Sequence, residues 1–301
     1  MAQESSASTI GVMEGISLPE LPSTTQKATK WARKNPVGIV GLFLILVLVA
    51  MALLSGALST HDPNSLEGDI NESPSAEHYL GTDLLGRDTF SRLLYGARVS
   101  LSVGFFAVFI GVTAGLILGL VSAYVGGVFD LLVQRLVDAN IAIPGIVLAL
   151  VIAAVLGPSV TNVIIALSVN YVSTATRVTR SVVLREKQRV YAESARALGA
   201  SGTRTMFRHV LPNSLSPYLV LVSVSIGSAI IGEASLSFLG AGVGANTPSW
   251  GSMLSMAAER PTDIPLAMAL APGMSIAAAV LGFNLFADAL RDTLDPRLRN
   301  R

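Results

Sequence analysis

The sequence contains no cysteine, and its lysines and charged residues are few. Without cysteine the chain has no disulfide bond, no thiolate nucleophile and no cysteine-ligated metal site. None of its four lysines follows a glycine, and the phosphate-binding pattern Gly-x-x-x-x-Gly-Lys-Ser/Thr is absent. The chain is therefore not expected to hydrolyse ATP itself.

Signatures of catalytic and metal sites are missing as well. Neither the nucleophile pattern Gly-x-Ser-x-Gly nor the zinc pattern His-Glu-x-x-His occurs. The three histidines, His61, His78 and His209, are scattered without the spacing of metal ligands. The sequence thus predicts no catalytic residue, no metal site and no cofactor-binding residue.

Apolar residues, in contrast, are abundant. Of the 301 residues, 51% are hydrophobic and 14% are charged, which is above the apolar share and below the charged share of soluble domains. This composition predicts an all-α integral membrane protein. The formal net charge of +1 gives no indication of nucleic-acid binding.

Six apolar stretches are interpreted as membrane-spanning helices, because about 20 apolar residues cross a hydrocarbon core of roughly 30 Å. They comprise 36–58, 99–125, a stretch that follows the charged segment 130–138 and ends near 156, 163–176, 217–239 and 265–286. Pro144 is expected to kink the third. The chain is then divided into a disordered cytoplasmic tail at 1–35, the first span at 36–58, an outer loop at 59–96, a five-helix core at 97–290 and a cytoplasmic tail at 291–301.

The charged residues indicate which side of the membrane each loop occupies. The charged residues within 59–96 are mainly acidic. Residues 177–208, in contrast, carry eight basic residues and are assigned to the inside by the positive-inside rule. Some of these basic side chains are expected to contact anionic lipid headgroups. Both termini are then cytoplasmic. Four arginines remain outside or near the outer face: Arg87, Arg92, Arg98 and Arg260.

Two patterns within the spans predict helix contacts. Gly111, Gly115 and Gly119 recur at every fourth position of the second span, so that another helix can approach this face closely. Asp138 is expected to form an ion pair with Arg135 rather than to take part in substrate chemistry.

Glu233 lies late in the fifth span. Inserting a carboxylate at the bilayer centre costs about 3 kcal/mol of free energy. Glu233 is therefore expected to face the bundle interior or to lie near the outer end of the span. A gate in a transport pathway, a hydrogen bond between helices and a purely structural role all stay open for this residue.

A polar stretch at 191–213 interrupts the apolar pattern. We predict a short amphipathic helix at 191–198 with Ala192, Ala195 and Leu198 on one face, ended by Gly199. Thr203 would cap a second helical segment running to 209, and the Leu-Pro-Asn sequence at 211–213 would break it. The result is a helix-turn-helix lying across a membrane face. An ordinary amphipathic connector would have the same pattern.

This stretch resembles the EAA loop of permease subunits of bacterial ATP-binding-cassette importers. Glu193-Ser194-Ala195, Gly199 and Leu211-Pro212 have the spacing of that motif, with Ser194 in place of its middle alanine and His209 at its aliphatic position. The resemblance implies a type I importer permease, a multi-pass protein of the bacterial inner membrane, whose loop docks on an ATPase as a coupling helix. It assigns docking to Tyr191, Glu193, Ala195, Leu198, Gly199, Leu211 and Pro212.

Three further segments resemble the branch of these permeases that imports dipeptides, oligopeptides or nickel. They are 78–101, 232–242 with 248–254, and 288–298. The resemblance implies a homologous second permease, two ATPase subunits that bind ATP and Mg²⁺, and an external substrate-binding protein. It also implies that Glu233 lies at the outer mouth of the pathway. Peptides are the expected substrate, while nickel and glutathione stay open because selection falls largely on the binding protein.

Two other classes of function fit the sequence less well. A proton-coupled carrier usually needs acidic or histidine relays within the membrane, and only Asp138 and Glu233 qualify. A membrane-embedded enzyme would need catalytic polar residues gathered at one depth, and the sequence offers no such cluster.

Overall fold

The structure is a computed structural model that describes residues 33–66, 68–244, 246–259 and 265–294. Residues 1–36 and 37–301 form two units. The arrangement reported below is that of the second unit. The predicted tails, 1–35 and 291–301, lie outside the described residues except at 33–35 and 291–294.

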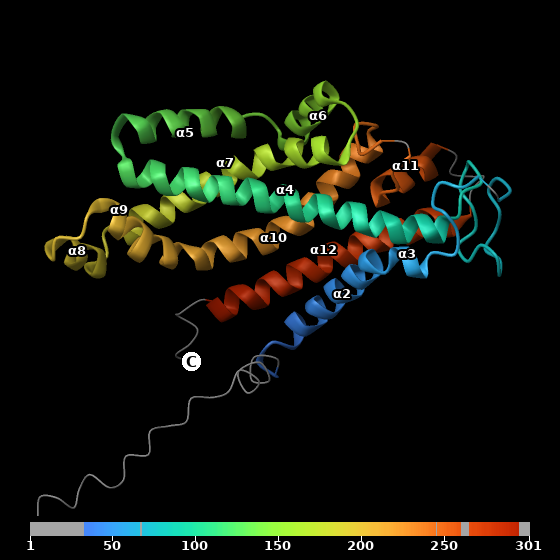
Figure 1. The fold of residues 1–301 in the computed structure, drawn as a ribbon, viewed down its shortest axis with the longest axis horizontal. Helices are drawn as coiled ribbons and strands as arrows, with labels where there is room; N and C mark the ends of the chain where they lie inside the picture. The colour runs from blue at the N-terminus through green and yellow to red at the C-terminus, as the bar shows by residue number, and fades with distance from the viewer. Residues whose placement is uncertain (1–32, 67, 245, 260–264, 295–301) are drawn as a thin grey trace, which may run out of the picture. The chain divides into compact units, whose positions relative to one another are not determined.

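Regular secondary structure in the described residues is helical, apart from one isolated bridge between Thr82 and Asp88. Figure 1 labels the helices. In chain order they are α2 (Pro36–Leu53), α3 (Ser55–Leu58), α4 (Thr89–Val125), α5 (Gly127–Ile141), α6 (Gly145–Leu156), α7 (Val160–Glu186), α8 (Val190–Ala197), α9 (Gly202–Thr205), the π-helix η1 (Met206–Val210), α10 (Leu211–Phe238), α11 (Trp250–Glu259) and α12 (Leu266–Leu294).

Four helical stretches of the described chain are long and apolar enough to cross a membrane: α2, α4, the run Gly202–Phe238 and α12. A fifth is obtained if α5 and α6 count as one broken span. α7 has 27 residues but is rich in serine, threonine and asparagine, and it is not among these stretches. The all-helical membrane class is confirmed, whereas six spans and cytoplasmic termini stay predictions.

The helix boundaries differ from the expected ones at two places. α4 begins at Thr89, within the segment expected to be loop up to residue 96, because Asp88 caps it by accepting a hydrogen bond from the Ser91 N–H at 2.7 Å. Pro144 does more than kink the third stretch. It separates α5 from α6 at a bend of 89°, since proline provides no N–H to continue the helical ladder.

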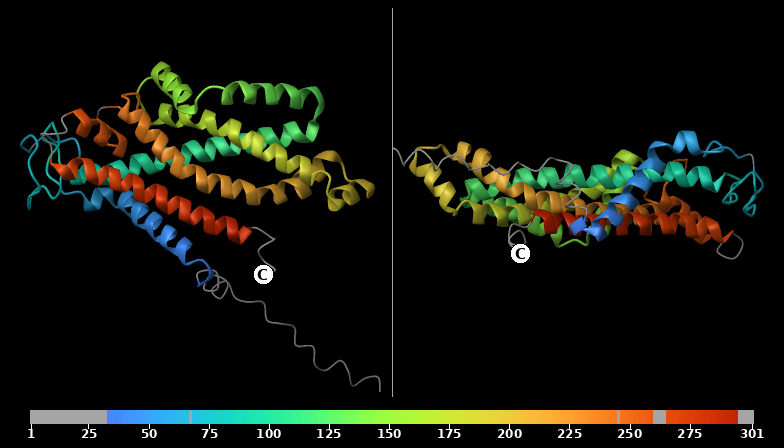
Figure 2. Two further views of the ribbon diagram at one scale, coloured as in Figure 1. Left: turned by 180° about the vertical axis from the view of Figure 1, so that it is seen from behind. Right: turned by 90° about the horizontal axis from the view of Figure 1, so that it is seen from below.

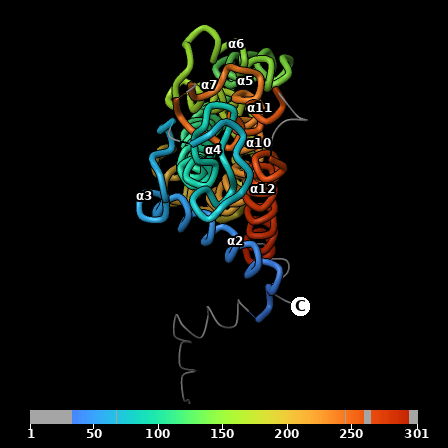
Figure 3. Tube along the Cα trace, turned by 90° about the vertical axis from the view of Figure 1, so that its right-hand side faces the viewer, coloured from blue at the N-terminus to red at the C-terminus, as the bar shows by residue number. Residues whose placement is uncertain are grey.

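The long helices α4, α7 and α10 pack against one another. Figure 1 and the left panel of Figure 2 both show α8 and α9 at one end of these helices, and the loop between α3 and α4 at the other. α12 packs on α10, and α2 meets α12 where Gly41 approaches Gly282. In Figure 3, which looks along the bundle, α2 and α12 lie on the side away from α5 and α6.

The glycine stripe of α4 lies against α7. A Cβ atom on Gly111 would come within 2.5 Å of the Ser168 carbonyl oxygen, and one on Gly115 within 2.5 Å of the Ala175 Cβ. Gly119 is equally close to the backbone of α7, at 2.6 Å from a carbonyl oxygen. Side chains at these positions would therefore push the two helices apart.

Ion pairs join α5, the first half of the broken third stretch, to α7. The Arg180 guanidinium of α7 binds both carboxylate oxygens of Asp130, at 2.8 Å and 2.6 Å. Asp138 lies 3.7 Å from Arg135 as predicted, but its shorter contact, 2.5 Å, is with Arg177. The sequence could not reveal this partner because α5 and α7 become neighbours only in the fold.

Large apolar side chains cover much of the outer surface. They include Phe43 on α2, Phe109 on α4, Val155 on α6 and Met274 on α12, each about half exposed or more. A soluble protein rarely exposes so much apolar surface, whereas a bilayer solvates it.

Candidate functional site

The segment at 190–205, which we call the elbow, contains α8, a turn and α9. α8 ends where Gly199 adopts a φ of +86°, a left-handed conformation that glycine takes without steric cost. The Ala200 N–H then donates to the Ala195 carbonyl at 3.0 Å and closes a Schellman turn. The helix stop predicted at Gly199 is therefore found, with α8 one residue earlier than expected at each end.

The elbow has one buried and one exposed side. Ala192 is fully buried and Ala195 is half-buried, whereas Glu193 and Gly199 are exposed. Leu198 was expected on the same face as Ala192. It lies instead just beyond the last turn of α8 and is 89% exposed, because the chain begins to turn at this residue.

Two hydrogen bonds hold α8 against the end of α7. The Tyr191 hydroxyl donates to Glu186 Oε2 at 2.8 Å, and an Arg196 nitrogen donates to the Lys187 carbonyl at 2.6 Å. Burial raises the pKa of the Tyr191 hydroxyl to about 12, and the bond to Glu186 and its negative charge act in the same direction. The hydroxyl therefore remains a donor throughout the physiological pH range.

The second half of the elbow continues directly into α10. Ser201, rather than Thr203, caps α9 by accepting a hydrogen bond from the Arg204 N–H at 3.3 Å. The break predicted at 211–213 is wrong. The π-helix η1 connects α9 to α10, and Pro212 stands in the first turn of α10, where its missing N–H is tolerated in this wider register.

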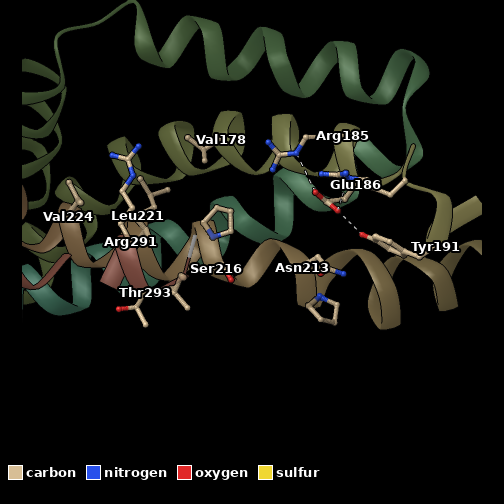
Figure 4. A pocket seen from close by; sticks show the side chains of 15 residues that line it. Val178, Arg185, Glu186, Tyr191, Asn213, Ser216, Leu221, Val224, Arg291 and Thr293 are labelled. Atoms are coloured by element: carbon tan, nitrogen blue, oxygen red, sulfur yellow. Dashed lines mark hydrogen bonds and ion pairs between the residues drawn. The ribbon is translucent and has the colours of Figure 1, made fainter. Parts of the chain in front are cut away.

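A groove of about 1160 Å³ lies beside the elbow, between α7, α10 and α12. Figure 4 shows Glu186 with Arg185 and Tyr191 on one wall, and Asn213 and Ser216 on another. The lining is mixed, with arginines contributed by α7 and α12. The groove was not predicted from the sequence. The repeated polar residues in the first turns of α10 were the available signal.

Glu233 lies near the far end of α10 from the elbow and is fully buried. Its carboxyl group accepts hydrogen bonds from the hydroxyls of Ser100 and Ser237, both at 2.8 Å. The Ser100 hydroxyl in turn accepts a hydrogen bond from the backbone N–H of Trp250 at 3.2 Å. Glu233 thus faces the interior of the bundle, where α4, α10 and α11 meet.

The loop before α4 is built around buried charges. Asp83 accepts hydrogen bonds from the N–H groups of Leu85 and Arg87 at 2.8 Å and 3.0 Å, the Asx-type turn that the local sequence allows. Its other oxygen lies 2.7 Å from the Arg87 guanidinium and 3.4 Å from that of Arg92. Gly81 and Gly86 take positive φ angles of 74° and 78° at the two turns.

The same loop brings together two of the three histidines. The ring centroids of His61 and His78 lie 4.7 Å apart, and Glu77 lies beside them. These two histidines, separated in the sequence, come together because the loop folds back on itself between α3 and α4. The absence of a metal site stays a prediction. His209 lies on η1, at the elbow.

The sequence matches two described protein families. Residues 111–300 match the family "Binding-protein-dependent transport system inner membrane component". Residues 23–79 match the "N-terminal TM domain of oligopeptide transport permease C". Together these matches include the elbow, the groove, Glu233 and the first part of the outer loop.

Individual proteins are similar over nearly the whole chain. The dipeptide transport system permease protein DppC of Alkalihalophilus pseudofirmus is 41% identical over 284 residues, 92% of this chain and 91% of that protein. The glutathione transport system permease protein GsiD of Pectobacterium atrosepticum is 41% identical over 275 residues, 90% of each chain. GsiD of Escherichia coli is 41% identical over 271 residues, 89% of this chain and 88% of that protein. The chain is a member of the family of inner-membrane permease components of binding-protein-dependent transport systems.

Proposed function

We propose that this chain is the permease subunit of an ATP-binding-cassette importer that moves short peptides across the inner membrane while partner subunits hydrolyse ATP. The proposal rests on the elbow. There the exposed Leu198 lies in a polar turn, and the chain then continues into the long apolar helix α10. The chain supplies the pathway, and it lacks the phosphate-binding pattern needed to hydrolyse ATP.

The exposed side of the elbow is the docking surface for an ATPase subunit. Leu198 is 89% exposed, Val190 at the start of α8 is 78% exposed, and Glu193 between them is exposed as well. Apolar side chains on a polar segment are suited to a protein groove, because burying one leucine contributes about 1.5–3 kcal/mol. The full assembly then contains two ATPases with ATP and Mg²⁺, a homologous second permease and an external substrate-binding protein.

The elbow is connected so that its movement reaches two long helices. The run Gly202–Phe238 joins it to α10, and the Tyr191–Glu186 hydrogen bond joins it to α7. A displacement of the elbow by an ATPase would therefore tilt α7 and α10 together, since packed helices move as rigid bodies. The pathway would alternate between its two openings as ATP is bound and hydrolysed.

The groove between α7, α10 and α12 supports peptides as the substrate class. Its volume, about 1160 Å³, exceeds the range of roughly 300–1,000 Å³ typical of small-molecule sites. Arg185 and Arg291 offer positive charge to the carboxylate terminus of a short peptide. Glutathione is itself a tripeptide, and similarity to a glutathione permease makes it the second candidate.

The test is uptake of labelled peptides by a strain that lacks this gene and carries it back on a plasmid. A labelled dipeptide and labelled glutathione are supplied in parallel, with and without a catalytically inactive partner ATPase. Uptake of either compound should depend on the active ATPase. Uptake that continues with the inactive ATPase would overturn the proposal in favour of an ion-driven carrier.

Docking is tested separately with Leu198→Ala. Because Leu198 contacts little of its own chain, the variant should insert at normal levels but import at least tenfold more slowly. Glu193→Lys and Gly199→Asp are expected to act in the same direction. The matched control is Val155→Ala on α6, where a comparably exposed side chain (81%) lies away from the elbow. Normal uptake by the Leu198 variant would show that the elbow is not the docking surface.

A further inference from the structure

The outer loop gathers three side chains that are able to bind a metal ion. His61 follows α3, while Glu77 and His78 lie shortly before α4. One ligand atom from each of these residues lies within 4.8 Å of the other two. The imidazole rings are inclined to each other by 35°, so they do not stack face to face.

His78 is held in the manner of a metal-binding histidine. Its Nδ1–H donates to Asp88 Oδ1 at 3.0 Å. Both residues are buried: His78 is 5% exposed and Asp88 is 2% exposed. Asp88 is itself fixed because it caps α4 through the Ser91 N–H. A carboxylate on one ring nitrogen fixes the tautomer and leaves the other nitrogen, Nε2, with a free lone pair for a metal.

The surroundings of this Nε2 atom fit a ligand role. It lies 3.8 Å from Glu72 Oε2, and a Cβ atom on Gly68 would approach it to 3.1 Å. The absence of a side chain at Gly68 therefore leaves room beside the nitrogen. On the facing ring, Nδ1 of His61 lies 3.0 Å from the Thr60 hydroxyl, which leaves the Nε2 atom of His61 available as well.

We propose that His61, Glu77 and His78 form a binding site for one divalent transition-metal ion of the zinc class. Two imidazoles and a carboxylate suit zinc and its neighbours, whereas magnesium and calcium prefer oxygen ligands alone. Glu72 or water would fill the fourth position. Ligand atoms at about 2.1 Å from a tetrahedral zinc stand roughly 3.4 Å apart. The half-buried His61 and the exposed Glu77 therefore have to move towards His78 by up to about 1.4 Å on binding.

The bound ion would connect the end of the first apolar helix to the segment that leads into α4. It would close the loop between α3 and α4 and restrict its conformations. This inference is independent of the proposed transport function, because the site lies at the end of the molecule opposite the elbow.

The test is metal binding by the full-length permease in detergent, purified with a tag that contains no histidine and stripped with a chelator. Zn²⁺ alone is titrated in competition with a chromophoric chelator. We expect one equivalent per chain, and at least tenfold weaker binding in His61→Asn and in Glu77→Gln. Both residues are accessible, so these variants should fold. His209→Asn is the matched control, since it removes the histidine at the elbow, and its affinity should equal that of the unmodified chain.

Co²⁺ provides a second measurement of the same site. The unmodified protein should give visible absorption bands typical of a four-coordinate site, and His61→Asn should lose them. Absence of saturable Zn²⁺ binding, or equal affinities in the His61 and His209 variants, would overturn the proposal.

Discussion

Ser100 of α4 donates a buried hydrogen bond to Glu233 of α10, with 2.8 Å between the hydroxyl oxygen and Oε2. The second carboxyl oxygen accepts a hydrogen bond from the Ser237 hydroxyl on the same helix, and the backbone N–H of Trp250 donates to the Ser100 hydroxyl. One carboxyl group therefore joins α4 and α10 directly and reaches α11 through Ser100. This geometry favours the structural and interhelical roles for Glu233.

Glu233→Leu should destabilise the permease, because two buried hydroxyls then lose their acceptor. Each unsatisfied buried group costs about 1–3 kcal/mol, so the melting temperature in detergent should fall clearly. Glu233→Gln, the matched variant, retains an acceptor oxygen and should stay near the unmodified protein in both melting temperature and peptide uptake. A leucine variant that melts at the normal temperature would rule out this role, and a stable glutamine variant without uptake would point to a gate.

Gly115→Ala should weaken the contact between α4 and α7. The new methyl group would lie 2.5 Å from both the Ala175 Cβ and the Val172 carbonyl oxygen, distances that force the helices to shift. We expect a loss of about 1–3 kcal/mol in the free energy of unfolding. Gly273→Ala on α12 is the control, since its nearest neighbour would be a leucine methyl at 3.9 Å. Helix propensity favours alanine equally at both positions, so the difference between the variants isolates packing. Equal stabilities would contradict the close approach.

The features that the sequence predicted correctly are those that local chemistry determines. A glycine every four residues marks a close helix contact whatever the partner, and Gly199 ends a helix because of its own conformational freedom. The same local reasoning was wrong at Pro212. A π-helix lets the chain pass that proline without a break, and the residues at 206–210 show no pattern that distinguishes a π-helix from an α-helix.

Features that depend on distant parts of the chain could not be predicted. The pairing of Asp138 with Arg177 and the approach of His61 to His78 both join segments whose contact is set by tertiary packing. The groove between α7, α10 and α12 likewise arises only when three separate helices meet. For Glu233, the cost of burying a carboxylate predicted a position in the bundle interior or near the outer end, and the structure shows the side chain buried. Its serine partners could not be predicted from the sequence.

Tyr191→Phe should loosen α8 without unfolding the helical bundle. The lost hydrogen bond to Glu186 is worth about 0.5–1.5 kcal/mol, which corresponds to roughly two- to twelvefold faster hydrogen exchange of the amides in α8. Exchange followed by mass spectrometry measures this change. Tyr79→Phe is the control, because Tyr79 lies on the outer loop and should leave α8 unaffected.

The effect of Tyr191→Phe should not depend on pH between 6 and 9. The pKa of the Tyr191 hydroxyl is about 12 in the folded protein, raised first by burial and then by Glu186, against about 10 in an unfolded chain. A group whose pKa is raised on folding contributes its full stabilisation below the unfolded value and loses it as the pH rises through the folded value. The ratio of exchange rates between variant and unmodified protein should therefore stay constant over this range. A ratio that falls towards one by pH 9 would mean that the hydroxyl ionises far earlier, and that its bond to Glu186 does not hold the elbow.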